Sequence, residues 1–487
     1  MDIVPAPPRG LFAGRKGRAR KETLTAYLFL LPAILIIFVF GLWPVIHALY
    51  VSFHKWNIRP RSATCIPYWL ASLGVGSEEA LESTECLGLN NYVNLLGINS
   101  LSAVAGLIIA LVLGFVAYRA WQRFRQERAE GSKQLPIAAS LWTLLALFFL
   151  IRDLPSLIES GEWTFLVSIG LILLAWLLWK GSSHRDSTGR LILRLIGSVL
   201  LITAGLYFFF VDFQRMWDLG SQTFFKSLLY TFFYSVGTVP VQLGVSLALA
   251  YILFQGIKGQ GFFRLLYFMP YIAPSVATAV VFRRIFTLRD TGLMNNLIGM
   301  LGVPAQKWLH EAKAVNLILI DLANQAFGTS WTWPSFSEPL NTVLAGPSLA
   351  LVSIIIYNWW VFIGYDTVIY LAGLGNIPNE LYEAAKIDGA GGLALFRKIT
   401  IPLLSPTTFF LTIIATIGTF KAFNHIWVMK EPAARDTVNT TSILIFNTFR
   451  ADGQFGQATA MAFILFGIIL IFSQIQNRIG DKLVFYG

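Results

Sequence analysis

Long apolar stretches, each bounded by a short polar or charged segment, alternate along almost the whole chain. A bilayer core about 30 Å thick needs about 20 mainly apolar residues for each spanning helix. Ten stretches come near that length: residues 25–50, 101–118, 135–151, 164–180, 191–211, 226–254, 262–282, 348–371, 401–429 and 458–476. The pattern therefore predicts an all-α polytopic membrane protein with about ten transmembrane helices.

The composition agrees with a chain dissolved in lipid. Of 487 residues, 55% are hydrophobic and only 13% are charged, and the mean hydropathy is +0.63. These values differ strongly from the averages of soluble domains. The first stretch is about 26 residues long and lacks a small-x-small cleavage site. We therefore expect a retained signal anchor rather than a cleaved signal peptide.

Basic residues predict the orientation, because loops on the cytoplasmic side carry an excess of Lys and Arg. The N-terminal tail, residues 1–23, is strongly basic and is predicted to be cytoplasmic. Counting spans from there also places the basic loops 119–134 and 180–194 inside and the acidic link 152–163 outside. The formal net charge is +11, and because much of it gathers in these inner segments we expect membrane lipid, not nucleic acid, beside it.

Both cysteines, Cys65 and Cys86, lie in the predicted extracytoplasmic loop 51–97. An oxidising compartment would permit a disulfide between them, but two unpaired thiols agree equally well with the sequence. Neither cysteine stands in a set of residues with metal-ligand spacing, so we expect no metal site.

One polar segment interrupts the apolar pattern between the eighth and ninth predicted spans. It is ELYEAAKIDGAGGLALFRKITIP, residues 380–402. Pro378 and Asn379 are helix-start signals and Gly389 is a stop signal, so the segment predicts two short helices at the cytoplasmic surface. An amphipathic loop that only lies on lipid headgroups is the alternative interpretation.

The residue order in this segment resembles the EAA loop of bacterial ABC importer permeases. Glu383-Ala384-Ala385 is followed after three residues by Gly389, and then by ITIP at 399–402. Ile401 stands where leucine is usual in that family.

The resemblance extends to about two thirds of the chain. It is to the carbohydrate-type permeases related to the larger membrane subunit of the maltose importer, and it implies the six-helix core of a type I importer. The segments that follow this family's order are residues 26–53, 88–96, 224–253, 263–286, 292–302 and 420–429.

Two regions depart from the family pattern. Four predicted spans lie between family segments, and because their number is even the core would keep its topology. A smaller expansion, residues 310–345, enlarges an outer loop. We therefore divide the chain into a cytoplasmic basic tail (1–23), a first core helix (24–50), an extracytoplasmic loop (51–97), an inserted four-helix region (98–218) and a permease core (219–487) with the EAA loop at 373–402.

The resemblance implies the transmembrane permease subunit of an ATP-driven, binding-protein-dependent importer for a sugar or oligosaccharide, in the bacterial inner membrane. The implied partners are a second permease subunit in a heterodimer, two ATPase subunits and an extracytoplasmic substrate-binding protein. The EAA helix would couple to the ATPase through Glu383, Ala384, Ala385, Lys386, Asp388, Gly389, Ile399 and Pro402.

The chain has no recognisable nucleotide or catalytic motif. It lacks a G-x-x-x-x-G-K-[ST] phosphate loop, and GIKGQG at 256–261 has the wrong spacing. It also lacks the H-E-x-x-H and Ser-His-Asp signatures. We therefore expect a transport subunit rather than an enzyme, with no cofactor of its own, and with ATP and Mg bound by the partner ATPase.

Polar residues inside the predicted spans indicate a candidate substrate path, because polar groups that face lipid are costly. Helical periodicity places Asn358, Tyr365 and Asp366 on one face of the eighth span. Asn424 lies with Lys421 and His425 on one sector of the ninth. Amides, carboxylates and aromatic faces suit a sugar, although the same residues could only join helices.

An ion pair between Asp366 and Lys421 is not expected, because Lys421 would lie about 10 Å nearer the outer face. A further polar row lies on the sixth span: Thr231, Tyr234, Thr238 and Gln242.

Other functions remain compatible with this pattern. The cargo could be glycerol phosphate or another polyol. An autonomous channel or secondary transporter is the third alternative, but inverted repeats would be expected there, and the EAA loop would have no use.

Overall fold

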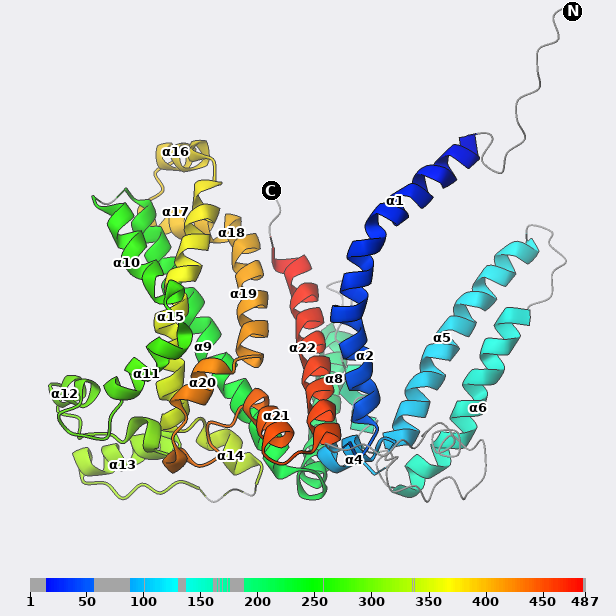
Figure 1. Cartoon of the computed structure of the whole chain (residues 1–487), viewed down its shortest axis with the longest axis horizontal. Coiled ribbons are helices and arrows are strands. Elements are labelled where there is room, and N and C mark those ends of the chain that lie inside the picture. The colour runs from blue at the N-terminus through cyan, green and yellow to red at the C-terminus, as the bar shows by residue number, and fades with distance from the viewer. Residues whose placement is uncertain are drawn as a thin grey trace, which may run out of the picture. The chain divides into compact units, whose positions relative to one another are not determined.

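Figure 1 shows the computed structural model of the chain, which describes residues 15–56, 88–99, 101–129, 137–160, 164, 167–168, 170–172, 174–175, 188–256, 258–334, 336 and 338–484. Within these ranges the fold is helical and has no β-strand, only one antiparallel bridge between Ala314 and Ser348. The all-α prediction is confirmed. The chain forms two compact units, residues 1–88 with 453–460 and residues 89–452 with 461–487.

The first unit contains the first predicted core helix. Helix α1 (Arg15–Ile37), the π-helical turn η1 (Phe38–Leu42) and α2 (Trp43–Ser52) follow one another without a break. Residues Thr25–Ser52 of this run are long and apolar enough to span a membrane. Gly41 lies inside the π turn and Pro44 is the second residue after it, and both residue types weaken the regular hydrogen-bond ladder of a helix.

The second unit begins with α4 (Asn90–Leu96), α5 (Leu101–Ala129), α6 (Ile137–Ser160) and α8 (Thr188–Leu219). Helices α5 and α6 pack against each other as an antiparallel pair (Figure 1). Gly106 permits this approach, because a Cβ there would lie 1.7 Å from Asp153 Oδ2. These helices contain three candidate spans. The fourth predicted span, 164–180, falls largely outside the described residues, so the four-helix content of 98–218 stays a prediction.

Helices α9 (Gln222–Phe254) and α15 (Leu349–Gly375) pack side by side and form the centre of the second unit. Each begins at a serine cap: Ser221 Oγ accepts from the Phe224 N–H at 3.3 Å, and Ser348 Oγ accepts from the Leu351 N–H at 3.1 Å. Such caps satisfy N–H groups that have no partner inside the helix. Helix α15 is mainly apolar, and 61% of its apolar window is buried.

The seventh predicted span, 262–282, is a broken helix rather than one rod. Helices α10 (Gln260–Ile272) and α11 (Ser275–Ile285) meet at a bend of 96°. Ala273 between them has an extended backbone, with ψ of 142°. The cause is Pro274, which has no N–H to donate and disfavours helical geometry at the residue before it.

The ninth predicted span, 401–429, is also interrupted. Helix α19 (Ser405–Phe420) ends before α20 (Asn424–Met429) begins. Lys421, Asn424 and His425 therefore do not share a face of one continuous helix, as the periodicity predicted. The stretch KAFNH, residues 421–425, contains the break at 421–423 and the first two residues of α20. Irregular backbone at membrane depth is stable where it lines a cavity, and this stretch does so.

The segment before α19 contains short helices. They are α16 (Asn379–Ile387), α17 (Gly392–Leu395), the π-helical η4 (Phe396–Thr400) and α18 (Ile401–Leu403). The run from Gly392 to Leu403 meets α19 at a bend of 62°. In Figure 1, α16 lies at one end of the unit, beyond the end of α15.

Other short helices gather at the opposite end of the second unit (Figure 1). They are α12 (Leu293–Gly299), η3 (Trp308–His310), α13 (Val315–Phe327), α14 (Leu340–Ala345), η5 (Pro432–Ala434) and α21 (Thr441–Arg450). Arg283 Nη2 and Glu431 Oε1 form an ion pair at 2.5 Å that joins α11 to this group. The last helix is α22 (Phe455–Leu483).

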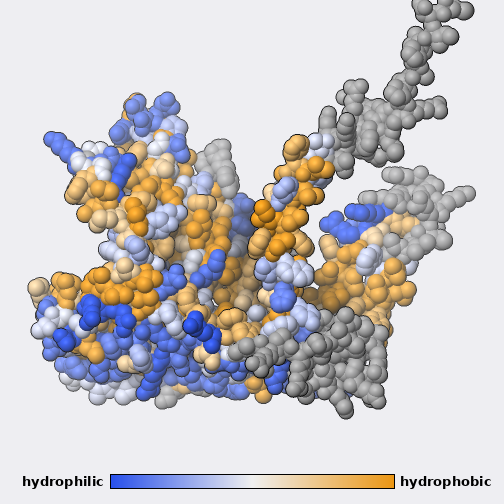
Figure 2. Space-filling model, viewed as in Figure 1, coloured by the Kyte–Doolittle hydropathy of each residue, from blue (hydrophilic) through white to orange (hydrophobic). Residues whose placement is uncertain are grey.

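The described residues contain seven helices that could each span a membrane, or nine if each bent pair is one span. Figure 2 shows hydrophilic residues around α16 and along the opposite edge of the second unit, with hydrophobic residues between them. This banding is the surface of a protein that crosses a bilayer. The polytopic fold predicted from the sequence is confirmed.

Candidate functional site

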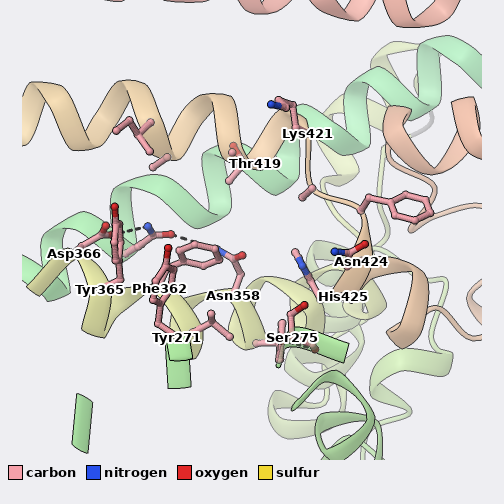
Figure 3. Close-up of a pocket in the computed structure, with 18 of the residues that line it drawn as sticks. Tyr271, Ser275, Asn358, Phe362, Tyr365, Asp366, Thr419, Lys421, Asn424 and His425 are labelled. Carbon is pink, nitrogen blue, oxygen red and sulfur yellow. Dashed lines mark hydrogen bonds between the residues drawn. The ribbon is translucent and has the colours of Figure 1, made fainter. Parts of the chain in front are cut away.

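A cavity of about 620 Å³ lies inside the second unit, between α9, α10, α15, α19 and α20 (Figure 3). Its polar and aromatic lining comes from Gln242, Tyr271, Ser275, Tyr357, Asn358, Phe362, Tyr365, Asp366, Thr419, Lys421, Phe423, Asn424 and His425. The four residues predicted to form a substrate path, Asn358, Tyr365, Asp366 and Asn424, are all among them. The structure thus brings them together around one space, while their contact with a substrate stays a prediction.

A chain of hydrogen bonds runs along one wall of the cavity. Gln242 Nε2 donates to Asp366 Oδ2 at 2.5 Å, and Asn358 Nδ2 donates to Gln242 Oε1 at 3.3 Å. The Tyr234 hydroxyl donates to Asn358 Oδ1 at 2.9 Å and lies 2.7 Å from His425 Nε2. Three helices that are distant in sequence, α9, α15 and α20, are joined by these bonds.

All hydrogen bonds in this series are donated in one direction, from His425 towards Asp366. The Tyr234 hydroxyl gives its one hydrogen to Asn358, so His425 Nε2 donates to the Tyr234 oxygen. Each amide then receives on its oxygen and donates from its nitrogen, and the series ends on the Asp366 carboxylate. Asp366 is only 2% exposed, so the hydrogen bond from Gln242 offsets part of the cost of its burial.

Aromatic rings form a second wall. Tyr271 of α10 and Tyr365 of α15 stack with ring centroids 4.4 Å apart, and Tyr271 meets Phe362 edge-on at 5.8 Å. Stacked and edge-to-face rings are the favoured arrangements of aromatic pairs. The wall therefore offers a flat apolar face beside the polar groups of Asn358 and Asp366.

Helix α10 is held against α15 by a backbone contact at Gly364. A Cβ at this position would lie 1.7 Å from the carbonyl oxygen of Tyr267, so only glycine permits the approach. Tyr267 is one helical turn before Tyr271, which lines the cavity.

Lys421 and Asp366 lie at opposite ends of the cavity and do not form an ion pair (Figure 3). This agrees with the expectation from the sequence. Asn424 and His425 lie at the Lys421 end, beside the break between α19 and α20.

The sequence analysis missed several polar or aromatic lining residues: Tyr271, Ser275, Tyr357, Thr419 and Phe423. It treated 262–282 as a regular span, and a regular span does not single out Tyr271 or Ser275. The signal was the sequence MPYIAPS at 269–275, because prolines that interrupt an apolar segment mark discontinuous helices, and transporters use these at their binding sites. Thr419 carried no signal that distinguishes it from the other threonines of α19.

The 380–402 segment forms the two short helices predicted for it. Helix α16 ends at Ile387, and Gly389 follows with a φ of +81°. The Gly389 and Ala390 N–H groups donate to the carbonyls of Lys386 and Ala385, at 3.0 and 2.9 Å. The stop signal that the sequence placed at Gly389 is therefore a left-handed turn of the backbone, which glycine adopts readily.

The predicted coupling residues lie mainly on the surface of this segment. Ala385, Ile399 and Pro402 are half-buried, while the remaining five, Glu383, Ala384, Lys386, Asp388 and Gly389, are exposed. The Tyr382 hydroxyl lies 3.1 Å from Thr400 Oγ1 and ties α16 to η4. Two apolar side chains beside them are almost free of contacts, because Ile387 is 86% exposed and Leu393 is 79% exposed.

Two further predictions concern the cysteines and metal binding. Cys65 and Cys86 lie outside the described residues, so both alternatives for them stay open. Within the part of the chain that the structure describes, no group of three or more His, Cys, Asp or Glu side chains could hold a metal ion.

Comparison with known proteins gives a consistent result. Residues 219–484 match the family described as binding-protein-dependent transport system inner membrane component. The probable ABC transporter permease protein YesP of Bacillus subtilis is 30% identical over 59% of this chain and 81% of its own length. The arabinooligosaccharides transport system permease protein AraP of Bacillus subtilis is 27% identical, over 56% and 77%.

A third relative has a different cargo in its name. The sn-glycerol-3-phosphate transport system permease protein UgpA of Agrobacterium fabrum is 30% identical over 55% of this chain and 80% of its own length. One similar solved structure is that of a bacterial alginate ABC transporter in complex with an alginate pentasaccharide-bound periplasmic protein. The similarity covers 61% of this chain and 96% of that chain, with a TM-score of 0.44 and a sequence identity of 18%.

Proposed function

Because this chain belongs to the family of binding-protein-dependent transport system inner membrane components, we propose that it is the permease subunit of an ATP-driven importer for a sugar or oligosaccharide. The cavity between α9, α10, α15, α19 and α20 is its translocation path. The observation that carries the proposal is the pairing of a flat aromatic wall, Tyr271 with Tyr365, and a row of polar groups that includes Asn358 and Asp366.

A sugar ring has an apolar face and a rim of hydroxyls, and the cavity offers a partner for each. The Tyr365 ring faces the apolar side of the sugar, while carboxylate and amide oxygens accept hydrogen bonds from its hydroxyls. Asp366 has one oxygen bound by Gln242, and the other can accept from cargo. Asn424, at the far end of the cavity, contributes a second amide.

The glycerol-phosphate alternative has one observation in its favour, which is the single cation Lys421 in the lining. A phosphate group is usually bound by several cationic or N–H donors. The Asp366 carboxylate would instead repel an anion. The balance of charges therefore supports a neutral sugar over a phosphorylated polyol.

Energy for transport comes, in this proposal, from a separate ATPase pair that binds ATP and Mg and contacts residues 380–402. The exposed apolar side chains of Ile387 and Leu393 support a docking role for this segment, because isolated apolar side chains with so few contacts gain most from a protein partner. The other proposed partners are a second permease subunit and an extracytoplasmic binding protein. The protein would lie in the bacterial inner membrane with its N-terminus in the cytoplasm.

A substitution that fills the cavity tests the translocation path. Gly418 lines the cavity, and a Cβ there would meet nothing within 4 Å. Gly418→Phe should therefore abolish uptake of radiolabelled oligosaccharide by vesicles that contain the complete transporter. The matched control is Gly244→Phe on α9, where a Cβ also meets nothing and the residue is exposed on the surface. Normal uptake by Gly418→Phe would show that cargo passes elsewhere.

A further inference from the structure

A second cleft, of about 390 Å³, lies near the α16 end of the second unit. Its walls come from α18 and α19 on one side and from the last turns of α22 on the other. The apolar part of the lining consists of Ile401, Phe409, Ile479, Gly480 and Val484. Nothing in the proposed transport path uses this cleft.

The hydroxyl groups in the lining do not make it polar. Ser405 Oγ donates to the carbonyl oxygen of Pro402 at 2.7 Å, and Thr412 Oγ1 donates to that of Thr408 at 2.7 Å. Because these two hydrogens are used within the helix, Ser405 and Thr412 present mainly carbon atoms to the cleft. Thr408 and Gln476 also line it, and Gln476 Oε1 is buried without a partner. The other lining residues are apolar, so most of the cleft suits a hydrocarbon better than a polar ligand.

Two contacts hold the walls together and give the cleft a fixed shape. The ring of Phe409 lies directly on Gly480, where a Cβ would be 2.4 Å from the ring atom Cε2. Gln476 Nε2 donates to Thr416 Oγ1 at 3.0 Å, deeper along the two helices.

Two cations stand close to the Ile401 wall of this cleft. Arg397 and Lys398 lie in η4, which leads directly into Ile401 in one helical run. Both side chains are exposed, and among the described residues neither forms an ion pair with an acid.

We propose that this cleft binds an acyl chain of an anionic phospholipid, whose phosphate is held by Arg397 and Lys398. The helices that form the cleft, α19 and α22, belong to candidate membrane spans, so the cleft lies beside lipid. Unpaired cations at a membrane surface attract anionic headgroups. The apolar cleft suits the acyl chain of a lipid, and the cations beside it suit its anionic headgroup.

The proposal does not depend on which cargo the transporter carries. It does have a consequence for the 380–402 segment, because η4 and α18 contribute both the cations and one wall. A bound lipid would contact both this segment and α22 and so connect them by noncovalent contacts.

Lipid retention by the purified full-length chain tests the proposal without a transport assay. The chain in detergent is mixed with equal amounts of phosphatidylglycerol and phosphatidylcholine and examined by native mass spectrometry. We expect the unaltered chain to retain phosphatidylglycerol preferentially and to gain thermal stability from it, since a ligand that binds only the folded state raises the Tm. Equal retention of the two lipids would overturn the proposal.

Two variants separate the acyl chain from the headgroup. Thr412→Phe fills the cleft and should abolish retention of both lipids, whereas the control Val236→Phe, at a residue 52% exposed, should not. Arg397→Gln with Lys398→Gln should remove the preference for phosphatidylglycerol and leave the cleft intact. The control for this charge change is Arg284→Gln with Arg289→Gln at the other end of the unit, which should keep the preference.

Two results would contradict the assignment. If Thr412→Phe retains as much lipid as the unaltered chain, the lipid binds elsewhere. If lipid is retained by the isolated chain but is absent from the complete transporter, the cleft is an interface with another subunit.

Discussion

The rings of Tyr271 and Tyr365 stack with their planes 24° apart and their centroids 4.4 Å apart, and so join α10 to α15 across one wall of the cavity. Tyr271 lies directly before the break between α10 and α11. The break therefore turns the end of α10 into part of the lining rather than part of a straight span. Tyr365 supplies the ring that faces the polar residues of α15.

Loss of the aromatic face should weaken transport more than loss of the hydroxyl. Aromatic contacts of this kind contribute about 0.5–1.5 kcal/mol. We expect Tyr365→Ala to raise the cargo concentration for half-maximal uptake by about three- to tenfold, and Tyr365→Phe to change it little. Uptake by reconstituted vesicles measures both. Equal defects in the two variants would mean that the hydroxyl, not the ring, contacts the cargo.

The bond from Gln242 to Asp366 should contribute to stability. Both side chains are almost fully buried, at 3% and 2% exposed. Asp366→Ala leaves the Gln242 donor without its acceptor, which costs about 1–3 kcal/mol. Asp366→Asn keeps an oxygen that can accept, so its thermal unfolding temperature should fall less. An equal fall in both variants would show that the negative charge, rather than the hydrogen bond, stabilises this region.

Substitutions at Gly389 should act through the backbone. A Cβ there would meet nothing within 4 Å, but the φ of +81° is unfavourable for other residues. Gly389→Val should strain the turn by about 1–2 kcal/mol and reduce ATP hydrolysis that depends on the binding protein. Gly389→Asn should retain more activity, because asparagine tolerates the left-handed region better. Equal activity of the two variants would show that the left-handed turn at Gly389 is not needed for coupling.

Charge reversal on the exposed face of α16 should disrupt the ATPase contact. Glu383→Lys would meet the cationic rim expected on the ATPase and lower the amount of ATPase that copurifies, at a cost of about 1 kcal/mol or more. Asp452→Lys is the control, since Asp452 is also an exposed acid but lies outside residues 380–402. If the Glu383 variant transports normally and still copurifies with the ATPase, the alternative interpretation is favoured, in which residues 380–402 form a loop that only lies on lipid headgroups.

Reporter fusions test the topology of the inserted region. If 98–218 holds four spans and the N-terminus is cytoplasmic, reporters near Gln126 and Asp186 should read cytoplasmic and one near Glu159 external. The positions differ in charge in the direction that the positive-inside rule requires. An external signal at Gln126 would contradict both the span count and the orientation.

The sequence predicted the residues of α15 that line the cavity because α15 is one regular helix. Asn358, Tyr365 and Asp366 are separated by seven and eight residues, which is close to two helical turns, so periodicity alone places them on one face. The same reasoning predicted the turn at Gly389, since a left-handed residue after a helix is usually glycine.

Periodicity failed where the backbone is not periodic. It placed Lys421, Asn424 and His425 on one sector of a helix, whereas α19 ends at Phe420 and α20 begins at Asn424. It also gave no reason to join Tyr234 to His425, whose hydrogen bond crosses from α9 to α20. Proline does not identify a break by itself, because Pro240 lies inside the continuous helix α9. Whether a membrane helix breaks depends on which neighbours satisfy the freed backbone groups, and a single sequence does not reveal them.

The contact between Gly364 and the Tyr267 carbonyl sets the distance between α10 and α15 behind the aromatic wall. A side chain added at position 364 would push α10 away from α15 and move Tyr271 with it. The cavity beside Tyr271 would then become wider without any change in the residues that line it. Cargo thickness could then be selected at a position that never meets the cargo.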